Sequence, residues 1–137
     1  MATYTITNGA AGVPAGEKAH LAQVVLDFSS TNLVAGTDVV QALEVPANTL
    51  VVCAGIEVIT AGGAGSVLDL GDTTVDRFVT DVDGNTVGAL EIGTASWLYT
   101  SADTIDLSAD TADFAGKVRV FALMAELGSG ETAAAFA

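Results

Sequence analysis

The chain has 137 residues, with 17 acidic side chains against 4 basic ones, so its formal net charge is −13. Four basic side chains cannot neutralise many phosphates, and this argues against nucleic acid and anionic membrane surfaces as partners. Half of the residues are hydrophobic and only 15 % are charged. That balance argues against intrinsic disorder and predicts one folded domain.

The N-terminal residues 1–16 are expected to form an extended arm or a first strand. Residues 3–7 read TYTIT, a run of β-forming residues closed by Asn8 and Gly9, and small turn-favouring residues follow up to Gly16. Such an arm often adds a strand to a neighbouring sheet, although for residues 3–7 alone we favour a first strand of their own sheet. The candidate partner contacts in the arm are Thr3, Tyr4, Thr5, Ile6 and Val13.

Residues 17–127 alternate between short apolar runs and clusters of Gly, Asp and Asn. The apolar residues repeat every second position, which is typical of strands, and no stretch keeps a helical period with caps. Many short strands separated by turns predict a β-sandwich or barrel. The expected strands are 21–28, 39–45, 50–60, 67–70, 77–80, 96–100, 104–107 and 117–127. The last ten residues, GSGETAAAFA, predict a flexible tail at 128–137.

The clearest strand is the run at 117–127. Alternate residues Val118, Val120, Ala122 and Met124 share one face. The other face begins with Lys117 and Arg119 but continues with Phe121 and Leu123, so the second half is apolar on both sides. Either a subunit interface or a covering loop would bury that second face. Phe121 and Leu123 are therefore further candidate partner contacts.

The run at 50–60 is also expected to be a strand, with Val51, Cys53, Gly55, Glu57 and Ile59 on its more solvated face. The other face would hold Val52, Ala54, Ile56 and Val58. The Gly-rich segment that follows predicts an antiparallel hairpin with residues 66–70. Cys53 stands in an apolar run without a basic neighbour, so we interpret it as a small buried hydrophobic residue.

Residues that could carry catalysis or bind a metal are scarce. His20 and Cys53 are the only histidine and cysteine, too few for a zinc site of the usual kind. We expect His20 to be an ordinary surface or edge residue and not a general base. Aspartates gather at 69–83 and 103–113, but turn positions explain them, and sugar-binding aromatic residues are few. The sequence thus predicts no enzyme, no cofactor and no assigned metal ligand.

The segment at 81–85, DVDGN, superficially matches a calcium loop. The EF-hand order requires Gly at the sixth position and Glu at the twelfth, whereas Gly84 is fourth and Ile92 is twelfth. A β-turn through Asp83, Gly84 and Asn85 is the simpler interpretation, and a calcium site of another kind in the Asp-rich loops stays open.

Several segments resemble small structural proteins of tailed bacteriophages, in particular the decoration or cement proteins that coat the capsid. The opening is TYTITNGAAGVPAGE at 3–17, and the centre is VVQALEVPANTL at 39–50 followed by GIEVITA at 55–61. LDLGD at 68–72 and DRF at 76–78 come next, and DTIDL at 103–107 leads to KVRV at 117–120. These segments are strands and turns, and the similarity extends over most of residues 3–127.

The resemblance implies an all-β fold, an antiparallel β-sandwich of jelly-roll type with an N-terminal arm. It also implies a non-enzymatic virion protein, made in the host cytoplasm, that assembles as a homotrimer and stabilises the capsid surface by binding the major capsid protein. The family offers no catalytic residues to carry over. A carbohydrate- or receptor-binding module of a phage tail or fibre is the alternative. Its platform would be Trp97, Leu98 and Tyr99, although we favour a buried core position for Trp97.

Overall fold

The computed structural model describes residues 19–127, and these fold into nine strands. The strands are β1 (Ala19–Asp27), β2 (Val39–Val45), β3 (Thr49–Thr60), β4 (Val67–Gly71), β5 (Val79–Asp83), β6 (Leu90–Ile92), β7 (Trp97–Tyr99), β8 (Asp103–Asp110) and β9 (Lys117–Glu126). No helix within the described range is long and apolar enough to cross a membrane. The N-terminal arm and the C-terminal tail predicted from the sequence lie outside the described residues.

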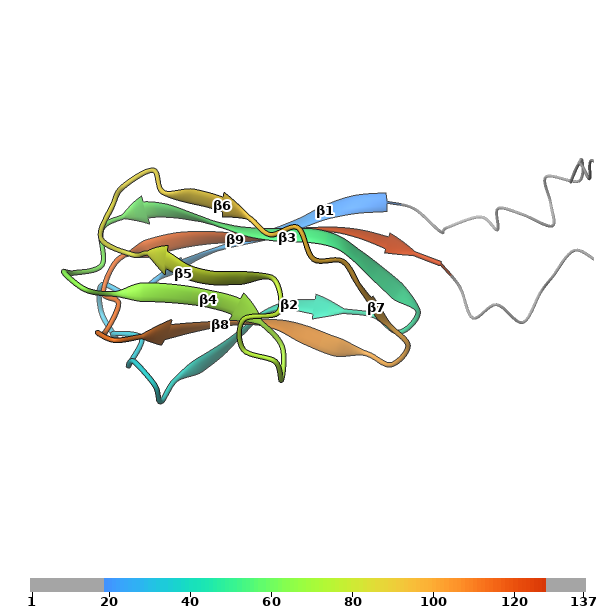
Figure 1. Cartoon of the computed structure of the whole chain (residues 1–137), viewed down its shortest axis with the longest axis horizontal. Helices are drawn as coiled ribbons and strands as arrows, with labels where there is room; N and C mark the ends of the chain where they lie inside the picture. Colours follow the sequence, from blue (N-terminus) through green and yellow to red (C-terminus); the bar gives the residue numbers. More distant parts are fainter. Residues whose placement is uncertain (1–18, 128–137) are drawn as a thin grey trace, which may run out of the picture.

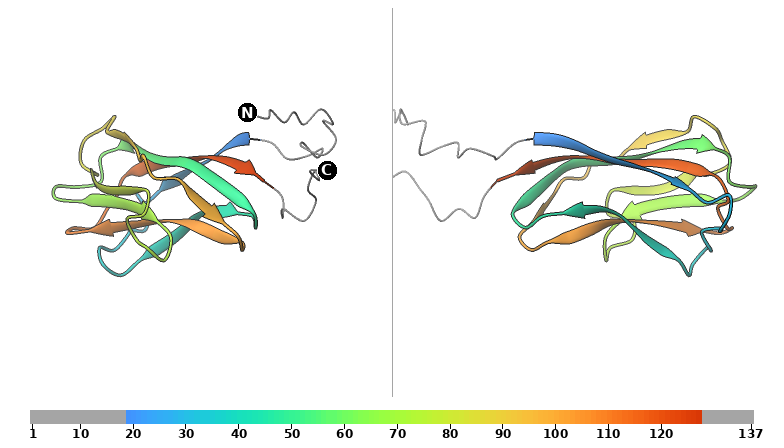
Figure 2. Two further views of the ribbon diagram at one scale, coloured as in Figure 1. Left: turned by 45° about the vertical axis from the view of Figure 1, so that its right-hand side comes forward. Right: turned by 180° about the vertical axis from the view of Figure 1, so that it is seen from behind.

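The strands form two antiparallel sheets packed face to face (Figures 1 and 2). One sheet has the order β1-β9-β3-β6, with β7 also paired to β3, and the other has the order β2-β8-β4-β5. The predicted all-β sandwich is therefore confirmed. The first strand pairs with the last and the second with the next to last, an order compatible with the expected jelly-roll connectivity.

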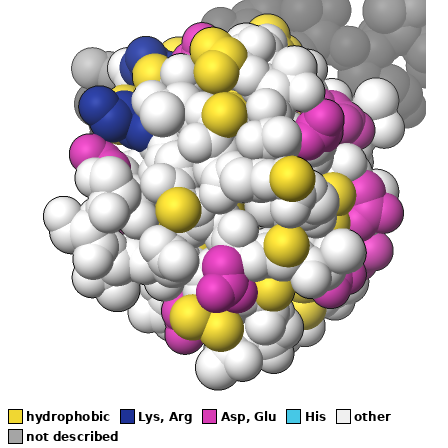
Figure 3. Space-filling view, turned by 90° about the vertical axis from the view of Figure 1, so that its left-hand side faces the viewer, with side chains coloured by type: hydrophobic (Ala, Val, Ile, Leu, Met, Phe, Trp, Pro, Cys, Tyr) yellow, Lys and Arg dark blue, Asp and Glu magenta, His cyan; other side chains and the backbone are white. Residues whose placement is uncertain are grey.

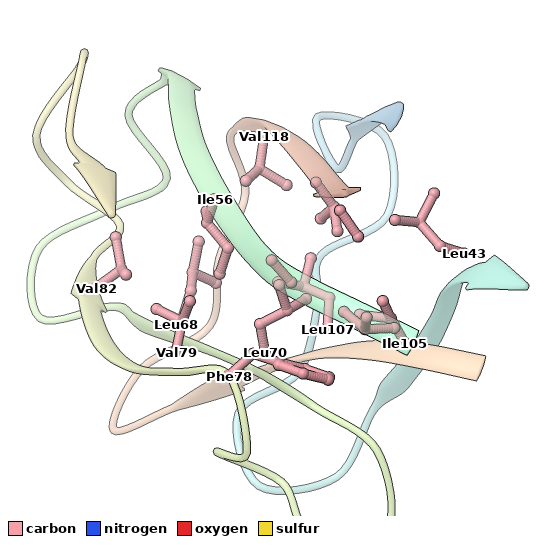
Figure 4. Packing of buried hydrophobic residues seen from close by; sticks show 14 of the residues in the cluster. Leu43, Ile56, Leu68, Leu70, Phe78, Val79, Val82, Ile105, Leu107 and Val118 are labelled. Carbon is pink, nitrogen blue, oxygen red and sulfur yellow. The ribbon is translucent and has the colours of Figure 1, made fainter. Parts of the chain in front are cut away.

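The core lies between the two sheets and is filled by the alternate side chains that point inward (Figure 4). The four residues that the sequence placed on one face of β9 are all fully buried in it. They are Val118, Val120, Ala122 and Met124. The opposite sheet contributes Leu68, Leu70, Ile105 and Leu107, which are also fully buried. Period-two alternation thus identified the core strands because each sheet has one face turned to the other sheet.

The predicted hairpin between residues 50–60 and 66–70 is wrong. β3 is a central strand that pairs with β9 on one side and with β6 and β7 on the other, so it has no free edge for β4. After Thr60 the chain crosses to the second sheet instead, where β4 pairs with β5 and β8. Gly62 makes this crossing close to the core, since an added Cβ there would lie 2.0 Å from Phe114 Cδ1.

A β-bulge in β3 changes which side chains face the core. The register with β9 shifts between Val51 and Cys53, so Val51 and Ala54 are both fully buried while Val52 is exposed. The backbone carbonyl of Val52 accepts a hydrogen bond from Ser96 Oγ at 2.6 Å. The sequence prediction reversed Val51 and Val52 because a bulge inserts one residue into a strict alternation. Cys53 is half-buried, not buried as predicted, because it faces outward from the sheet.

Most predicted strands differ from the observed ones by a few residues at their ends, and one strand was missed. The strand expected at 77–80 is β5, which runs from Val79 to Asp83, and Arg77 lies in the preceding loop. β6 was not predicted, because three residues with exposed side chains show no alternation to detect. The strand expected at 39–45 has the same boundaries as β2.

Candidate functional site

The outer face of the β1-β9-β3-β6 sheet carries several exposed apolar side chains. Antiparallel register places the alternate residues of β1, β9, β3 and β6 that point away from the core side by side on this face. Four large apolar side chains on it are 46–59 % exposed: Leu21, Val25, Leu90 and Ile92. Several large apolar side chains exposed on one face mark an interaction site more often than an isolated exposed residue does. We call these residues, with Phe121 and Leu123, the apolar face.

Phe121 and Leu123 lie at the centre of the apolar face, on the middle strand β9. Phe121 is opposite Gln23 of β1 and Gly55 of β3, and Leu123 is opposite Leu21 and Cys53. A Cβ added at Gly55 would lie 2.5 Å from Phe121 Cζ, so the missing side chain leaves room for the aromatic ring. Both side chains are half-buried. The sequence thus correctly predicted a strand that is apolar on both faces.

Charges on this face neutralise each other. Arg119 Nε lies 2.8 Å from Glu57 Oε1, and Arg119 Nη1 donates a hydrogen bond to Gln23 Oε1 at 2.9 Å. The ion pair is partly exposed and adds little to stability by itself. Its consequence is that the centre of the apolar face carries no net charge.

The outer face of the second sheet is acidic. Asp69, Asp81 and Asp110 come from three adjacent strands, and their carboxylate oxygens lie within 4.8 Å of one another. The Asp81 backbone N–H donates a hydrogen bond to Asp69 Oδ1 at 2.9 Å. Burial, together with the negative charges of Asp81 and Asp110, raises the pKa of Asp69 above its ordinary value. The sequence showed two separate groups of aspartates, and only the β5-β4-β8 pairing brings these three together.

Acidic side chains are also widespread at the end of the sandwich that lies on the left in Figure 1. Figure 3 shows Lys and Arg side chains at one corner of this end, whereas Asp and Glu side chains are spread around it. All three basic residues between 19 and 127 have an acidic neighbour: Arg77 pairs with Asp72, Arg119 with Glu57, and Lys117 lies near Asp27. Among residues 19–127 the unpaired charge is therefore negative, and the cluster of Asp69, Asp81 and Asp110 lies on the sheet opposite the apolar face.

The acidic cluster does not form a complete site for a cation or for sugar hydrolysis. Ca²⁺ usually takes six to eight oxygen ligands, and the cluster offers three carboxylates. A neighbouring hollow of about 200 Å³, bounded by Asp38, Asp69 and Asp110, has no aromatic side chain in its lining. Asp83 forms the predicted turn, accepting hydrogen bonds from the Asn85 backbone N–H at 2.9 Å and from Thr86 Oγ1 at 2.8 Å.

A second polar cluster joins the loop between β4 and β5 to β7. Asp72 Oδ2 accepts hydrogen bonds from Arg77 Nε and from the Tyr99 hydroxyl, each at 2.6 Å. Asp72 Oδ1 accepts a third from the Thr74 backbone N–H at 2.8 Å. The Arg77 guanidinium also lies over the Trp97 ring, 3.5 Å from its centroid. These contacts tie the loop between β4 and β5 to β7.

The charge state of this cluster follows from its hydrogen bonds. Burial alone would raise the pKa of Asp72, but the bonds from Tyr99, Thr74 and Arg77 outweigh burial and hold that pKa below its ordinary value. Burial and the bond to Asp72 raise the pKa of Tyr99 above its ordinary value. Tyr99 therefore stays protonated and donates to an ionised Asp72.

The residues of the alternative sugar platform differ in exposure. Trp97 is 45 % exposed, so its expected core position is wrong, and Tyr99 is the buried aromatic residue of β7 instead. Arg77 covers one face of the Trp97 ring, where a sugar would stack. The exposure of Trp97 follows from its place on a three-residue strand at the sheet edge, which a sequence pattern cannot show.

His20 and Cys53 do not form a catalytic pair. His20 is exposed on β1, as expected for an edge residue, and lies opposite the core residue Met124. Cys53 lies opposite Leu123, whose side chain points outward. Because opposite residues of an antiparallel pair share a side, His20 and Cys53 are on opposite faces of one sheet.

Comparison with solved structures places the sandwich among known folds. A chain of the cyanophage Pam1 capsid asymmetric unit superimposes with a TM-score of 0.65 at 16 % identity, over 90 % of this chain and 93 % of that chain. The sandwich is a fold found in phage capsids. A chain of the Ralstonia phage GP4 capsid gives a TM-score of 0.61 at 17 % identity, over 85 % and 89 % of the two chains.

A third similar structure comes from the acidic stable capsid of Helicobacter pylori bacteriophage KHP30. Its TM-score is 0.59 at 18 % identity, and the match covers 78 % of this chain and 86 % of that chain. No protein-family model and no curated protein sequence matches the chain. The resemblance to phage structural proteins that the sequence suggested is therefore confirmed at the level of the fold.

Two of the seven predicted partner contacts, Phe121 and Leu123, lie together on the apolar face. Thr3, Tyr4, Thr5, Ile6 and Val13 lie outside the described residues. The sequence analysis missed Leu21, Val25, Leu90 and Ile92 as members of the same face. Leu21 and Val25 could have been found from the alternation in β1, whereas Leu90 and Ile92 needed the pairing of β6 with β3.

Proposed function

We propose that the protein is a non-enzymatic virion structural protein that decorates a bacteriophage capsid and stabilises it by binding the major capsid protein. The observation that carries this proposal is the fold shared with chains of three phage capsids, over most of both chains in each comparison. The exposed apolar face supports it, because removing apolar surface from water favours the binding of a partner that covers it.

The apolar face is the surface that we assign to the capsid shell. Its central charges, on Arg119 and Glu57, neutralise each other, so a partner meets little unpaired charge there. The opposite outer face carries Asp69, Asp81 and Asp110, and removing these carboxylates from water would be costly. The protein would therefore lie with its apolar face on the shell and its acidic face toward solvent. Assembly as a homotrimer is part of the proposal.

The test measures binding of the purified full-length protein to shells assembled from the major capsid protein of the same phage. Leu90→Glu puts a charge on the apolar face at a side chain that is 59 % exposed, and Val39→Glu is the matched control at 58 % exposure on the opposite outer face. Both positions are at the surface, so neither substitution disturbs the core. Sedimentation with the shells, followed by electron microscopy, measures occupancy.

We expect wild-type protein and Val39→Glu to bind the shells, and Leu90→Glu to bind at least about tenfold more weakly, the equivalent of 1.4 kcal/mol. Failure of the wild-type protein to bind shells that lack it would overturn the decoration role. Equal binding by the two variants would reject the apolar face as the docking surface. Binding of the same protein to glycans in an array, without binding to shells, would favour the receptor-binding alternative.

A further inference from the structure

Three of the four sheet edges in the described part of the chain are protected against pairing with another strand. β6 and β7, at one edge, have three residues each. β2 has a bulge between Gln41 and Leu43. β5 has a register irregularity, and Asp81 there has a positive φ of 56°. Short strands, bulges and charges are the usual means by which proteins blunt an exposed edge.

The remaining edge, β1, has none of these protections. It pairs with β9 over nine consecutive residues without a register shift, and among the described residues it has no partner on its other side. Its only ionised acidic group is Asp27, at its end. A long, regular and nearly uncharged edge is a template for an added strand.

A hydrogen bond next to β1 shows which of its backbone groups point away from β9. The Phe28 N–H donates to the Gly116 carbonyl at 2.9 Å, so the backbone of residue 28 points toward β9. Antiparallel strands alternate in this respect, and hence Ala22, Val24 and Leu26 also point toward β9. The N–H and C=O groups of Leu21, Gln23 and Val25 point toward the open edge.

The inward side chains of β1 are also incompletely buried. Ala22, Val24 and Leu26 point toward the core and pack against it, yet they are only half-buried. On the central strand β9, the corresponding inward residues are fully buried. A strand beyond β1 with apolar residues at two alternate positions would complete the burial of this row.

We propose that residues Thr3–Thr7 of a second copy of this chain pair with the open edge of β1. This segment reads TYTIT, so Tyr4 and Ile6 share one face and suit the half-buried row, while the threonines lie on the other face beside Leu21 and Val25. The segment contains no charged side chain. It can therefore approach a protein of net charge −13 without the repulsion that two sandwich bodies would meet.

The connection to β1 favours a second copy over the same molecule. Residues 8–18, eleven in all, separate the segment from Ala19 and include Pro14. Hairpin loops most often have two to five residues, so this connection is long for a hairpin within one chain. Extended, eleven residues reach roughly 36 Å, which is enough to cross to a neighbour. A head-to-tail exchange of this kind forms a ring when the rotation between copies is 120°, the symmetry that a trimer requires.

The experiment is residue-resolved amide hydrogen exchange on the isolated full-length protein, with the oligomeric state followed by analytical ultracentrifugation. It needs no capsid, so its result is independent of the decoration role. The variant is Ile6→Pro, which prevents the segment from pairing as a strand. Ala11→Pro is the matched control, since it places the same residue in the connection and outside Thr3–Thr7.

In the wild-type oligomer we expect the amides of Leu21, Gln23 and Val25 to be protected, as those of Ala22, Val24 and Leu26 are. Ile6→Pro and dilution to the monomer should each speed exchange of the first three amides by about 100-fold or more, and leave the second three unchanged. Ala11→Pro should behave as wild type.

Three results would overturn the proposal. Unprotected amides at Leu21, Gln23 and Val25 in the concentrated wild-type protein would show that no strand covers this edge. Protection that Ile6→Pro removes but dilution does not would show pairing within one chain. Protection that dilution removes but Ile6→Pro does not would show pairing by another element, such as β1 of the second copy.

Discussion

The Tyr99 hydroxyl makes a testable contribution to stability through its bond to Asp72. Tyr99→Phe removes this hydroxyl and keeps the ring, which is 5 % exposed, so packing changes little. The lost bond is 2.6 Å long and has an ionised, buried acceptor, and bonds of this kind contribute about 1.5–3 kcal/mol. Asp72 keeps its bonds to Arg77 and to the Thr74 backbone, so no buried charge is left unpaired.

We therefore expect Tyr99→Phe to lower the free energy of unfolding by about 2 kcal/mol at pH 7 and the melting temperature by roughly 8 °C. Urea unfolding followed by circular dichroism measures the first quantity, and calorimetry measures the second. The Tyr99 bond helps to hold the pKa of Asp72 below its ordinary value, so the bond stabilises the fold most when Asp72 is ionised.

The pH dependence separates this bond from packing. As the pH falls through the folded-state pKa of Asp72, the carboxylate is protonated and the difference between wild type and Tyr99→Phe should shrink. A difference below about 0.5 kcal/mol at pH 7 would refute the assigned strength of the bond. A difference that does not change with pH would show that the hydroxyl acts through packing and not through a charged acceptor.

Two further substitutions and one pH profile test other parts of the structure. Asp69→Asn should raise the free energy of unfolding at pH 7 by on the order of 1 kcal/mol, because it removes a carboxylate whose charge is disfavoured by burial and by repulsion from Asp81 and Asp110. The gain should fade at lower pH, and a loss of stability at pH 7 would contradict it. Burial raises the pKa of Asp69 and Asp106, so wild-type stability should increase as the pH falls from 7 through these raised pKa values. It should decrease at lower pH, where Asp72, whose pKa is held below its ordinary value, becomes protonated. A steady decline from pH 7 would be inconsistent with these shifts. Phe114→Ala should lower the free energy of unfolding in urea by about 3–5 kcal/mol, because the ring is fully buried and packs edge-on against Phe28, with 5.8 Å between the ring centroids. The control Leu98→Ala, at a 48 % exposed position, should lower it by less than about 0.5 kcal/mol. Similar losses for the two variants would be evidence against this core.

Alternation along single strands was sufficient to predict most of the fold. β9 shows this best: its inward residues, such as Val120, are fully buried, and its outward residues Phe121 and Leu123 are half-buried. A side-chain period of two depends only on local backbone geometry, and a sandwich turns one face of every long strand to the core. The all-β class therefore followed directly from the sequence.

Features that depend on which strands meet could not be predicted in this way. The proposed hairpin failed because a Gly-rich loop fits a tight turn within a sheet as well as a crossing between sheets, and only the pairing of β3 with β9 decides between them. The bulge at Val52 reversed the faces of two residues for a similar reason.

The candidate site was predicted in part. The outward residues of β9 were identified, because apolar residues that alternate with core residues can be recognised from the sequence of a single strand. The clustering of Asp69, Asp81 and Asp110 was not, since it needs three strands in a fixed order. The exposure of Trp97 was also missed, because it follows from the place of the short strand β7 at the sheet edge, which only the pairing with β3 shows.

The most direct test of the proposed role is a cryo-electron microscopy map of the phage particle that carries this protein. We predict sandwich-shaped density on the outside of the shell, with the β1-β9-β3-β6 sheet against the major capsid protein and the acidic sheet toward solvent. Sandwich density confined to the tail, or an intact shell without such density, would contradict the decoration role. Density on the shell with the acidic sheet inward would contradict the assigned docking face.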